Sequence, residues 1–290
     1  MKKVILITYA VISFCFMYAQ KQVNGVIYIH LPNFSGQVIP NKGRQNNFEL
    51  TQVSVKPNNI TDEDVWFRDN QISLDYESYS FYGYKSDEPT TRNLKRFFPS
   101  NVGDLTITYC EKYDTYYAVY YSINGEGYNG VVLVALYDKS FKPIATLDFT
   151  AFMYAPQTKQ GDEEYVLQTI SHAHLVGNTL YIQHGHNTYA ASSYNQNAYI
   201  SAIDITNGRI IWTTEPLTCN SNFIIVDNSI ICGYGFTAEP DYLYIVDINT
   251  GARRNRYKLA KAPALITRKG NYIYVRTYNK DYIYKLEYGN

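Results

Sequence analysis

Apolar and polar residues alternate in short segments along this sequence, and residues that favour tight turns separate the segments. In the second half each unit has one order: a strand, a tight turn, a strand, a longer loop, a strand, a tight turn and a fourth strand. No window has a convincing 3.6-residue period, so we expect few helices. The pattern predicts an all-β chain.

The units recur at a fixed spacing. Residues 241–247 match residues 281–287, and residues 202–208 match residues 245–251. A weaker fourth copy covers residues 107–149. Four antiparallel strands repeated at about 40–45 residues are typical of a β-propeller blade. The sequence therefore predicts a β-propeller of four-stranded antiparallel blades.

The last repeat ends one strand short of a full blade, which leaves residues 282–287 with an open edge. Open edges invite aggregation, so another strand should cover them. Residues 25–31 alternate like a lone strand, and we expect them to pair there and close the ring. Residues 33–106 should then supply one or two further blades, giving five or six in all.

Within that irregular region, residues 64–68 and 71–76 have the pattern of strands. We interpret residues 88–96 as an excursion from the blades.

One repeat carries a recognisable motif over residues 202–212, Ala-Ile-Asp-Ile-Thr-Asn-Gly-Arg-Ile-Ile-Trp. It closely resembles the tryptophan-docking motif of PQQ-like propeller repeats, in which the Trp of one blade packs against a tight turn of its neighbour. Residues 247–251 repeat the middle of the motif, with Asn255 at the Trp position. The matching residues are Ala202, Asp204, Gly208, Trp212, Asp247 and Gly251.

The resemblance covers residues 171–287 and is specific for architecture. It implies that Trp212 is buried between adjacent blades. Quinoprotein dehydrogenases of this family are much longer and carry a vicinal Cys pair, which this sequence lacks. The chain looks more like the family's non-catalytic binding and scaffold members, so we expect no PQQ and no other cofactor.

The first nineteen residues have the features of a secretory signal peptide. Lys2 and Lys3 precede an apolar run over residues 4–16, and Ala19 is a small residue at the expected cleavage point. The run is too short for a transmembrane helix, and a lipoprotein signal at Cys15 is a second alternative. We expect cleavage after Ala19, one propeller domain over residues 20–290, and a secreted or periplasmic location.

The composition argues against several other classes of protein. The 26 Lys and Arg residues balance 26 Asp and Glu residues, which argues against nucleic-acid binding. The chain has 31 Tyr, a residue that packs its ring and keeps its hydroxyl hydrated. Cys110, Cys219 and Cys232 lack the spacing of a disulfide framework, so we interpret them as small buried hydrophobic residues.

The loop lengths indicate where function lies. Turns between the first and second strands of a unit, and between the third and fourth, are tight. The remaining connections are longer, and alternating strand direction places them all on one face. Variable loops on a rigid scaffold often bind ligands, so we expect a polar and aromatic concavity on this face. The long segments are residues 124–130, 151–168, 187–196 and 235–240.

Four of the five histidines lie between residues 172 and 186. A two-residue turn at residues 177–178 would pair His172 with Gln183 and Ser171 with His184. The two His-x-His pairs would then point to opposite sides of the sheet, so we predict no metal site. The candidate binding residues are His172, His184, His186, Tyr189 and Tyr194.

The motifs of serine hydrolases, zinc proteases and P-loop enzymes are absent from the sequence. We therefore predict a binding or scaffold module for a protein or glycan partner, rather than an enzyme. One alternative is a hydrolase or lyase with carboxylates contributed by different blades. Another is a quinone- or metal-dependent oxidoreductase.

Overall fold

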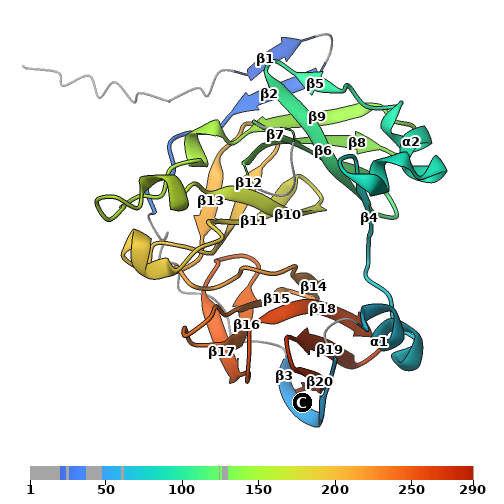
Figure 1. Cartoon of the computed structure of the whole chain (residues 1–290), viewed down its shortest axis with the longest axis vertical. Coiled ribbons are helices and arrows are strands. Elements are labelled where there is room, and N and C mark those ends of the chain that lie inside the picture. The colour runs from blue at the N-terminus through green and yellow to red at the C-terminus, as the bar shows by residue number, and fades with distance from the viewer. Residues whose placement is uncertain are drawn as a thin grey trace, which may run out of the picture.

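Four β-sheets make up most of the described chain. The computed structural model describes residues 20–23, 26–36, 48–59, 62–123, 125 and 130–289. Figure 1 shows the four sheets following one another around an arc, as blades do in a β-propeller. The predicted all-β propeller fold is confirmed.

The second, third and fourth sheets each have four strands, and all the pairs are antiparallel. The second sheet contains β10 (Thr169–Val176), β11 (Thr179–Gly185), β12 (Tyr199–Asp204) and β13 (Ile210–Thr213). The third contains β14 (Ile224–Val226), β15 (Ser229–Tyr234), β16 (Tyr242–Asp247) and β17 (Arg253–Lys258). The fourth contains β18 (Pro263–Lys269), β19 (Tyr272–Thr277), β20 (Lys280–Tyr288) and β3 (Phe48–Pro57).

The first sheet is larger, with eight strands. Its centre is the predicted weak repeat, and it gains strands on both sides. The strands are β1 (Gln20–Val23), β2 (Val26–His30), β4 (Glu77–Ser80), β5 (Asn101–Val102), β6 (Leu105–Lys112), β7 (Tyr116–Ser122), β8 (Val131–Asp138) and β9 (Pro143–Asp148).

The described helices are short. They are α1 (Glu63–Asn70), α2 (Pro89–Lys95) and the 3₁₀ turns η1 (Tyr84–Asp87), η2 (Thr150–Phe152), η3 (Glu163–Tyr165) and η4 (Ala190–Ser193). The strand predicted at residues 64–68 is wrong, because α1 covers it. Glu63 and Asp64 lie in the first turn of α1 and Arg68 in its last, where their charges suit the helix dipole. The strand predicted at residues 71–76 is also wrong, since no ladder forms there.

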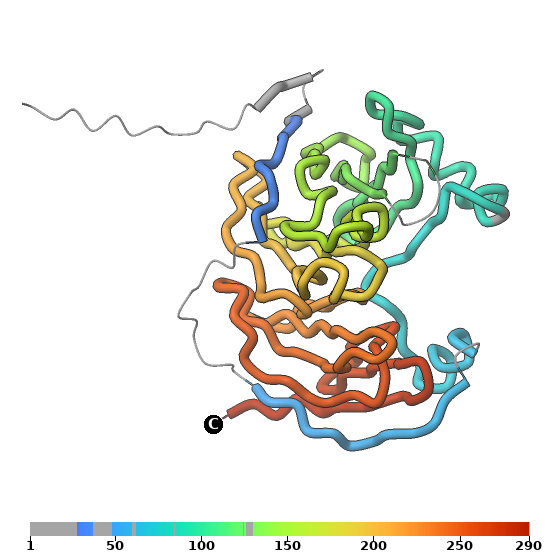
Figure 2. The backbone as a smooth tube through the Cα atoms, turned by 60° about the vertical axis from the view of Figure 1, so that its left-hand side comes forward, coloured from blue at the N-terminus to red at the C-terminus, as the bar shows by residue number. Residues whose placement is uncertain are grey.

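The predicted closing strand is wrong. Residues 26–30 form β2, which runs parallel to β9 in the first sheet. The open edge of β20 is covered instead by β3, antiparallel along its whole length. Figure 2 shows β3 running beside the C-terminal strand, far from residues 28–36. The edge of β20 is therefore covered, as expected, but by β3 and not by residues 25–31.

The predicted count of five or six blades is not confirmed. The described residues form four sheets. Residues 48–102 contribute single strands and short helices to the two end sheets and form no blade of their own. The excursion predicted at residues 88–96 contains α2.

Trp212 locks the second sheet to the third. Its side chain is 1% exposed, and its indole N–H donates to the carbonyl of Ile248 at 3.1 Å. The ring lies over Gly251, where an added Cβ would come within 2.5 Å of the indole. Gly251 also has a φ of +72°, which suits glycine in the β16–β17 turn. The predicted packing of Trp212 between blades is confirmed.

The first sheet contacts the second in the same way with a different residue. Ile29 of β2 lies over Gly208 in the β12–β13 turn, so close that an added Cβ would be 2.2 Å from its methyl group. Ile29 is buried. A glycine turn on one sheet covered by an apolar side chain from its neighbour therefore occurs at two successive interfaces.

Side chains of the first sheet also form hydrogen bonds with backbone groups of β10, the inner edge strand of the second sheet. Tyr109 and Tyr113 donate to carbonyls of β10, the latter to Ala173 at 2.7 Å. The hydroxyl of Tyr116 accepts from the amide of Leu175 at 2.9 Å. These tyrosines lie on β6, β7 and the turn between them, so they fasten the first sheet to the second.

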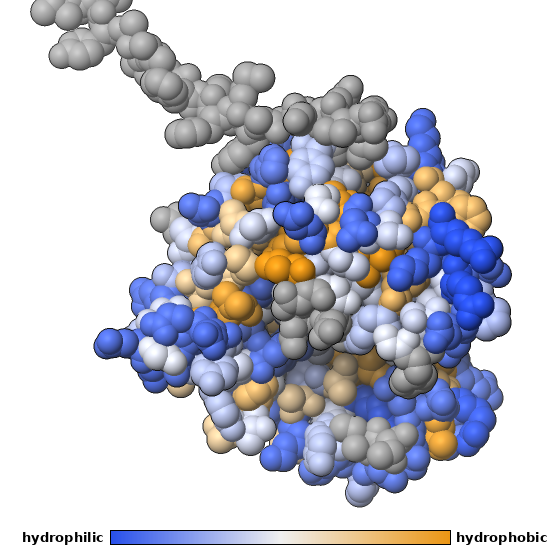
Figure 3. Space-filling model, turned by 45° about the horizontal axis from the view of Figure 1, so that its top comes forward, coloured by the Kyte–Doolittle hydropathy of each residue, from blue (hydrophilic) through white to orange (hydrophobic). Residues whose placement is uncertain are grey.

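The surface in Figure 3 is largely hydrophilic, with hydrophobic residues gathered in separate small patches. Across the described residues, no helix has the length and apolar character needed to span a membrane. Cys110, Cys219 and Cys232 are buried free thiols.

Replacing Trp212 with alanine should lower the free energy of unfolding by about 3–5 kcal/mol, the range for truncating a buried large aromatic residue. Tyr278→Ala is the control, because Tyr278 is 64% exposed and should cost less than about 0.5 kcal/mol. Urea unfolding monitored by far-ultraviolet circular dichroism, which reports on the backbone, measures the stability of both variants. Equal midpoints for the two variants would contradict the role of Trp212.

Candidate binding site in the central cavity

The inner strands share an irregularity where they approach one another. Thr108 of β6, Ser171 of β10 and Ala264 of β18 are each left out of register between paired neighbours. A bulge of this kind bends a strand and redirects its side chains, and such bulges are frequent beside functional sites. Three sheets therefore turn toward a common centre at matching positions.

The bulge at Ser171 corrects one predicted pairing. His172 pairs with Gln183 as predicted, but His184 pairs with Ile170 rather than Ser171. The extra residue interrupts the ladder between the two pairs. The cross-strand pair of His172 and Gln183 becomes the important one, since directly paired residues lie on the same side of a sheet.

A cavity of about 230 Å³ lies where the four sheets converge. Its entrance includes residues 220–222, through which the chain enters β14, and Ala264 near the start of β18. Connections between blades emerge on the long-loop face, so the cavity opens toward that face. The other lining residues are Tyr76, Ser78, Tyr109, Glu111, Ser171, His172, Gln183 and Leu265.

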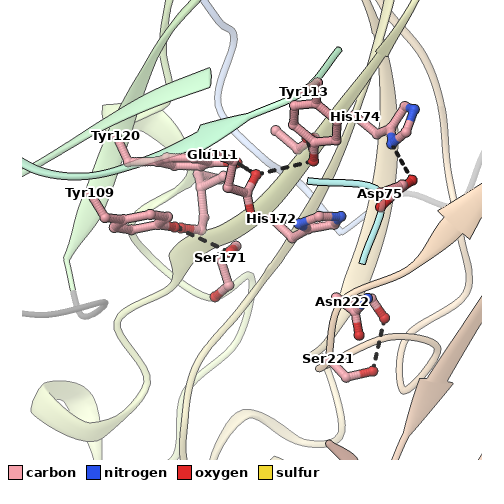
Figure 4. Close-up of polar contacts among 12 residues, drawn as sticks. Asp75, Tyr109, Glu111, Tyr113, Tyr120, Ser171, His172, His174, Ser221 and Asn222 are labelled. Carbon is pink, nitrogen blue, oxygen red and sulfur yellow. Dashed lines mark hydrogen bonds and ion pairs between the residues drawn. The ribbon is translucent and has the colours of Figure 1, made fainter. Parts of the chain in front are cut away.

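Glu111 and His172 form a buried pair in the cavity wall (Figure 4). Nδ1 of His172 lies 2.7 Å from Oε1 of Glu111, and both side chains are almost wholly buried. The other carboxylate oxygen accepts hydrogen bonds from Tyr113 at 3.2 Å and from Tyr120. Both oxygens of Glu111 are thus engaged by groups of the protein itself.

The pKa of His172 is raised above its ordinary value. Burial alone favours the neutral ring, but the charge and hydrogen bond of Glu111 outweigh burial and favour protonation. His174 lies two residues further along β10. Burial and the charge of His172 lower its pKa to about 4. The pKa values of the two histidines are therefore shifted in opposite directions.

Two buried polar atoms of the cavity wall have no hydrogen-bond partner. They are Nε2 of His172 and Oε1 of Gln183. The amide nitrogen of Gln183 is engaged, since it donates to the carbonyl of Cys219 at 3.2 Å. Buried polar groups normally have a partner, so each exception requires a physical explanation.

Residues 72–76, which we call the crossing segment, close the opposite end of the cavity. The hydroxyl of Thr267 on β18 donates to the carbonyl of Ser73. The ring of Tyr76 lies 5.0 Å from that of His172 and 5.6 Å from that of Tyr113. The segment therefore contacts the first, second and fourth sheets.

A larger hollow of about 650 Å³ lies beyond the crossing segment, and Tyr76 lines both spaces. Its wall includes Lys112 at the end of β6 and Asp114 in the β6–β7 connection. That connection is a tight turn, so this hollow lies on the face opposite the long loops. Asp75, also in its wall, has its pKa raised mainly by burial and lies 3.8 Å from Nδ1 of His174.

Among the predicted binding residues, His172 alone lines the cavity. Both ring nitrogens of His184 are engaged, by Gln168 at 3.1 Å and Ser201 at 2.9 Å. Those of His186 are engaged by Ser193 and Thr188. Since both rings are buried and saturated, we assign His184 and His186 a structural role.

Tyr189 and Tyr194 are exposed in the long loop between β11 and β12. Tyr189 packs edge-on against Phe236, and Tyr194 lies beneath the amine of Lys159. These contacts connect three of the four long segments.

For three of the four long segments, hydrogen bonds between them agree with the predicted common face. The amide of Ala190 donates to Glu239 at 2.8 Å, and the amide of Lys159 donates to the carbonyl of Ser192 at 2.8 Å. The segments at residues 151–168, 187–196 and 235–240 therefore lie together. The fourth, residues 124–130, falls outside the described residues except for Gly125 and Gly130.

Sequence reasoning missed Glu111, Gln183 and Asn222. Asn222 donates to the carbonyl of Ile266 at 2.8 Å and accepts from its amide at 2.9 Å, which joins the third and fourth sheets at the cavity entrance. Glu111 carried one weak signal, because it directly follows the apolar and aromatic residues Tyr109 and Cys110 near the end of a predicted strand. Within the described ranges, no cluster of three or more His, Cys, Asp or Glu side chains is placed to hold a metal ion.

No family profile and no curated protein matches the sequence. Among solved structures, the computationally designed Ika4 protein is similar with a TM-score of 0.36 and 10% identity, over 61% of this chain and 87% of that chain. BamB from Moraxella catarrhalis has a TM-score of 0.33 and 10% identity, over 64% and 70% of the two chains. The WD40 β-propeller domain of Doa1 has a TM-score of 0.35 and 14% identity, over 63% and 60%. These similarities concern the fold alone.

The buried histidines predict a loss of stability in acid. Burial lowers the pKa of His184 from 6.5 to about 3, so below pH 6.5 the unfolded chain binds a proton that the folded chain does not. Stability must then fall as the pH falls through this window. His174 and His186 act in the same direction. His172 acts oppositely: its contribution is complete below pH 6.5 and is lost as the pH rises through its raised folded pKa.

Protonation linked to His184 should cost the wild type about 2 kcal/mol of stability between pH 7.5 and pH 5. His184→Gln should abolish this part of the acid loss, because glutamine can keep polar contacts without titrating. His30→Gln is the matched control at a largely exposed histidine. Urea midpoints at the two pH values give the comparison. An unchanged acid loss in His184→Gln would show that this ring does not cause it.

Proposed function

We propose that this protein is a secreted or periplasmic β-propeller of the PQQ-like repeat type that acts as a binding module. The mature chain would be residues 20–290 in one domain, following a signal peptide over residues 1–19, which lies outside the described residues. The packing of Trp212 on the Gly251 turn supports the assignment of the repeat type. The basic start and the short apolar run support export.

One observation carries the binding role: a polar and aromatic cavity opens toward the long-loop face and has unpartnered polar atoms in its wall. Binding sites usually combine a concave space with a few polar groups that fix the orientation of a ligand. The cavity is smaller than the typical range of about 300–1,000 Å³. It therefore suits a small ligand or the terminal unit of a larger one, with Tyr189 and Tyr194 available for contacts outside.

A hydrolase with carboxylates from different blades is the second candidate. Asp75 and Glu111 favour it, because the charge of Glu111 is close enough to contribute to the raised pKa of Asp75. Against it, both oxygens of Glu111 already accept hydrogen bonds from the protein. A nucleophile or general base needs a free oxygen directed at the substrate. Asp75 moreover lines the hollow beyond the crossing segment.

The test uses a variant that fills the cavity entrance. Ala264 is exposed and lines the entrance, so Ala264→Trp should occlude it while leaving the core intact. Ala260→Trp is the matched control at an exposed alanine outside the lining. Thermal shifts are measured with a panel of neutral monosaccharides, polyols, amino acids, short peptides and small carboxylates.

At least one ligand class should raise the melting temperature of the wild type and of Ala260→Trp, but not of Ala264→Trp. Mass spectrometry of the ligand after incubation should show it unchanged, as expected of a binding module. Ligand cleavage that Ala264→Trp abolishes would favour the hydrolase. A panel with no response sensitive to Ala264→Trp would refute the proposed site.

A further inference from the structure

Resting on the proposed function, we infer that the central cavity binds a neutral sugar unit, with His172 and Gln183 recognising one of its hydroxyl groups. The unpartnered atoms differ in kind. Nε2 of His172 is a donor whenever Nδ1 and Nε2 both carry protons, and Oε1 of Gln183 is an acceptor. A hydroxyl group can accept from the first and donate to the second at once.

The two residues lie side by side in the wall of the cavity. His172 and Gln183 face each other across β10 and β11 in direct register, and both side chains line the same cavity. Nδ1 of His172 is held by Oε1 of Glu111, and this contact sets the orientation of the ring. The amide of Gln183 is likewise held by its bond to the Cys219 carbonyl. A preorganised donor and acceptor pair of this kind needs little reordering when a ligand binds.

The charge balance of the wall favours a neutral ligand. The carboxylate of Glu111 is offset by His172, and no Lys or Arg is found among the described residues that line the cavity. An anion would find only His172, whose charge Glu111 already offsets, and a cation would find both oxygens of Glu111 already engaged. Burying an unpaired charge is costly, so charged ligands are disfavoured.

The rest of the lining suits a sugar ring. Tyr76 and Tyr109 are the aromatic residues of the lining, and the small polar residues Ser78, Ser171 and Ser221 also line it. Aromatic rings pack well against the apolar faces of a sugar, while hydroxyl groups meet its edge. The volume of the cavity limits this to one sugar unit, with any continuing chain leaving toward the long loops.

Isothermal titration calorimetry with D-glucose, D-galactose and D-mannose tests the inference on the mature protein. Glucosamine and glucuronate serve as positively and negatively charged analogues of glucose. At least one neutral hexose should bind, the charged analogues should bind at least tenfold more weakly, and Ala264→Trp should abolish binding. Ala260→Trp should bind as the wild type does.

The decisive variant is Gln183→Leu, which keeps the size of the side chain and removes the acceptor. It should weaken hexose binding about tenfold, the effect of losing one net hydrogen bond. A set of deoxy analogues identifies the hydroxyl concerned. The deoxy sugar that lacks it should bind the wild type about tenfold more weakly, and Gln183→Leu should weaken that analogue no further.

Three results would overturn the inference. Binding of another class of ligand in the same cavity, blocked by Ala264→Trp and without hexose binding, would leave the binding role intact but refute the sugar. If crystals grown with hexose contained only an ordered water bridging His172 and Gln183, the sugar would likewise be refuted and the binding role left intact. Hexose binding that Gln183→Leu leaves unchanged would refute the recognising pair, with Ala264→Trp as the variant to rely on if Gln183→Leu fails to fold.

Discussion

The inner strand of a propeller blade has one side that no neighbouring strand pairs, and the backbone groups there need hydrogen bonds from elsewhere. A buried backbone group without a partner costs about 1–3 kcal/mol. In this protein side chains from the adjoining sheet supply many of those bonds. Tyr109, Tyr113 and Tyr116 serve β10, and Asn222 serves both the amide and the carbonyl of Ile266 on β18.

This constraint gives part of the high tyrosine content a physical reason. A tyrosine fills the space between sheets with its ring and reaches a backbone group with its hydroxyl. The same requirement brings in Glu111. Its carboxylate accepts from Tyr113 and Tyr120 and then pairs with His172. The network that joins the first two sheets therefore also forms part of the cavity wall, so a substitution of Glu111 or His172 would disturb this interface as well as the site.

Local patterns predicted the blades because each blade is a local object. The repeat spacing and the turn at Gly251 are visible within about forty residues, and the docking motif predicts that Trp212 is buried between blades. Closure was mispredicted because it joins the two ends of the chain. Residues 25–31 and 48–57 both alternate enough to cover β20, and no local signal decides between them. The cavity was beyond sequence reasoning for the same reason, since Glu111, His172 and Asn222 come from different repeats.

The His cluster shows how a local signal can mislead. His172 and His184 are close in sequence and in space, yet one has a free nitrogen and the other has none. The bulge at Ser171 changes the register of this hairpin. Residue type and spacing suggested a shared role, and the partners of each ring assign them separate ones.

The periphery and the centre of the fold follow different rules. At the outer turns, an indole over Gly251 and an isoleucine over Gly208 achieve the same packing, so that interaction depends on shape and tolerates exchange. At the centre, most polar side chains are matched to named atoms, and the buried atoms without a partner on β10 and β11 are Nε2 of His172, Nδ1 of His174 and Oε1 of Gln183. His172 and Gln183 both line the cavity, whereas His174 does not. The unmatched pair is best explained by a partner that is not part of the chain.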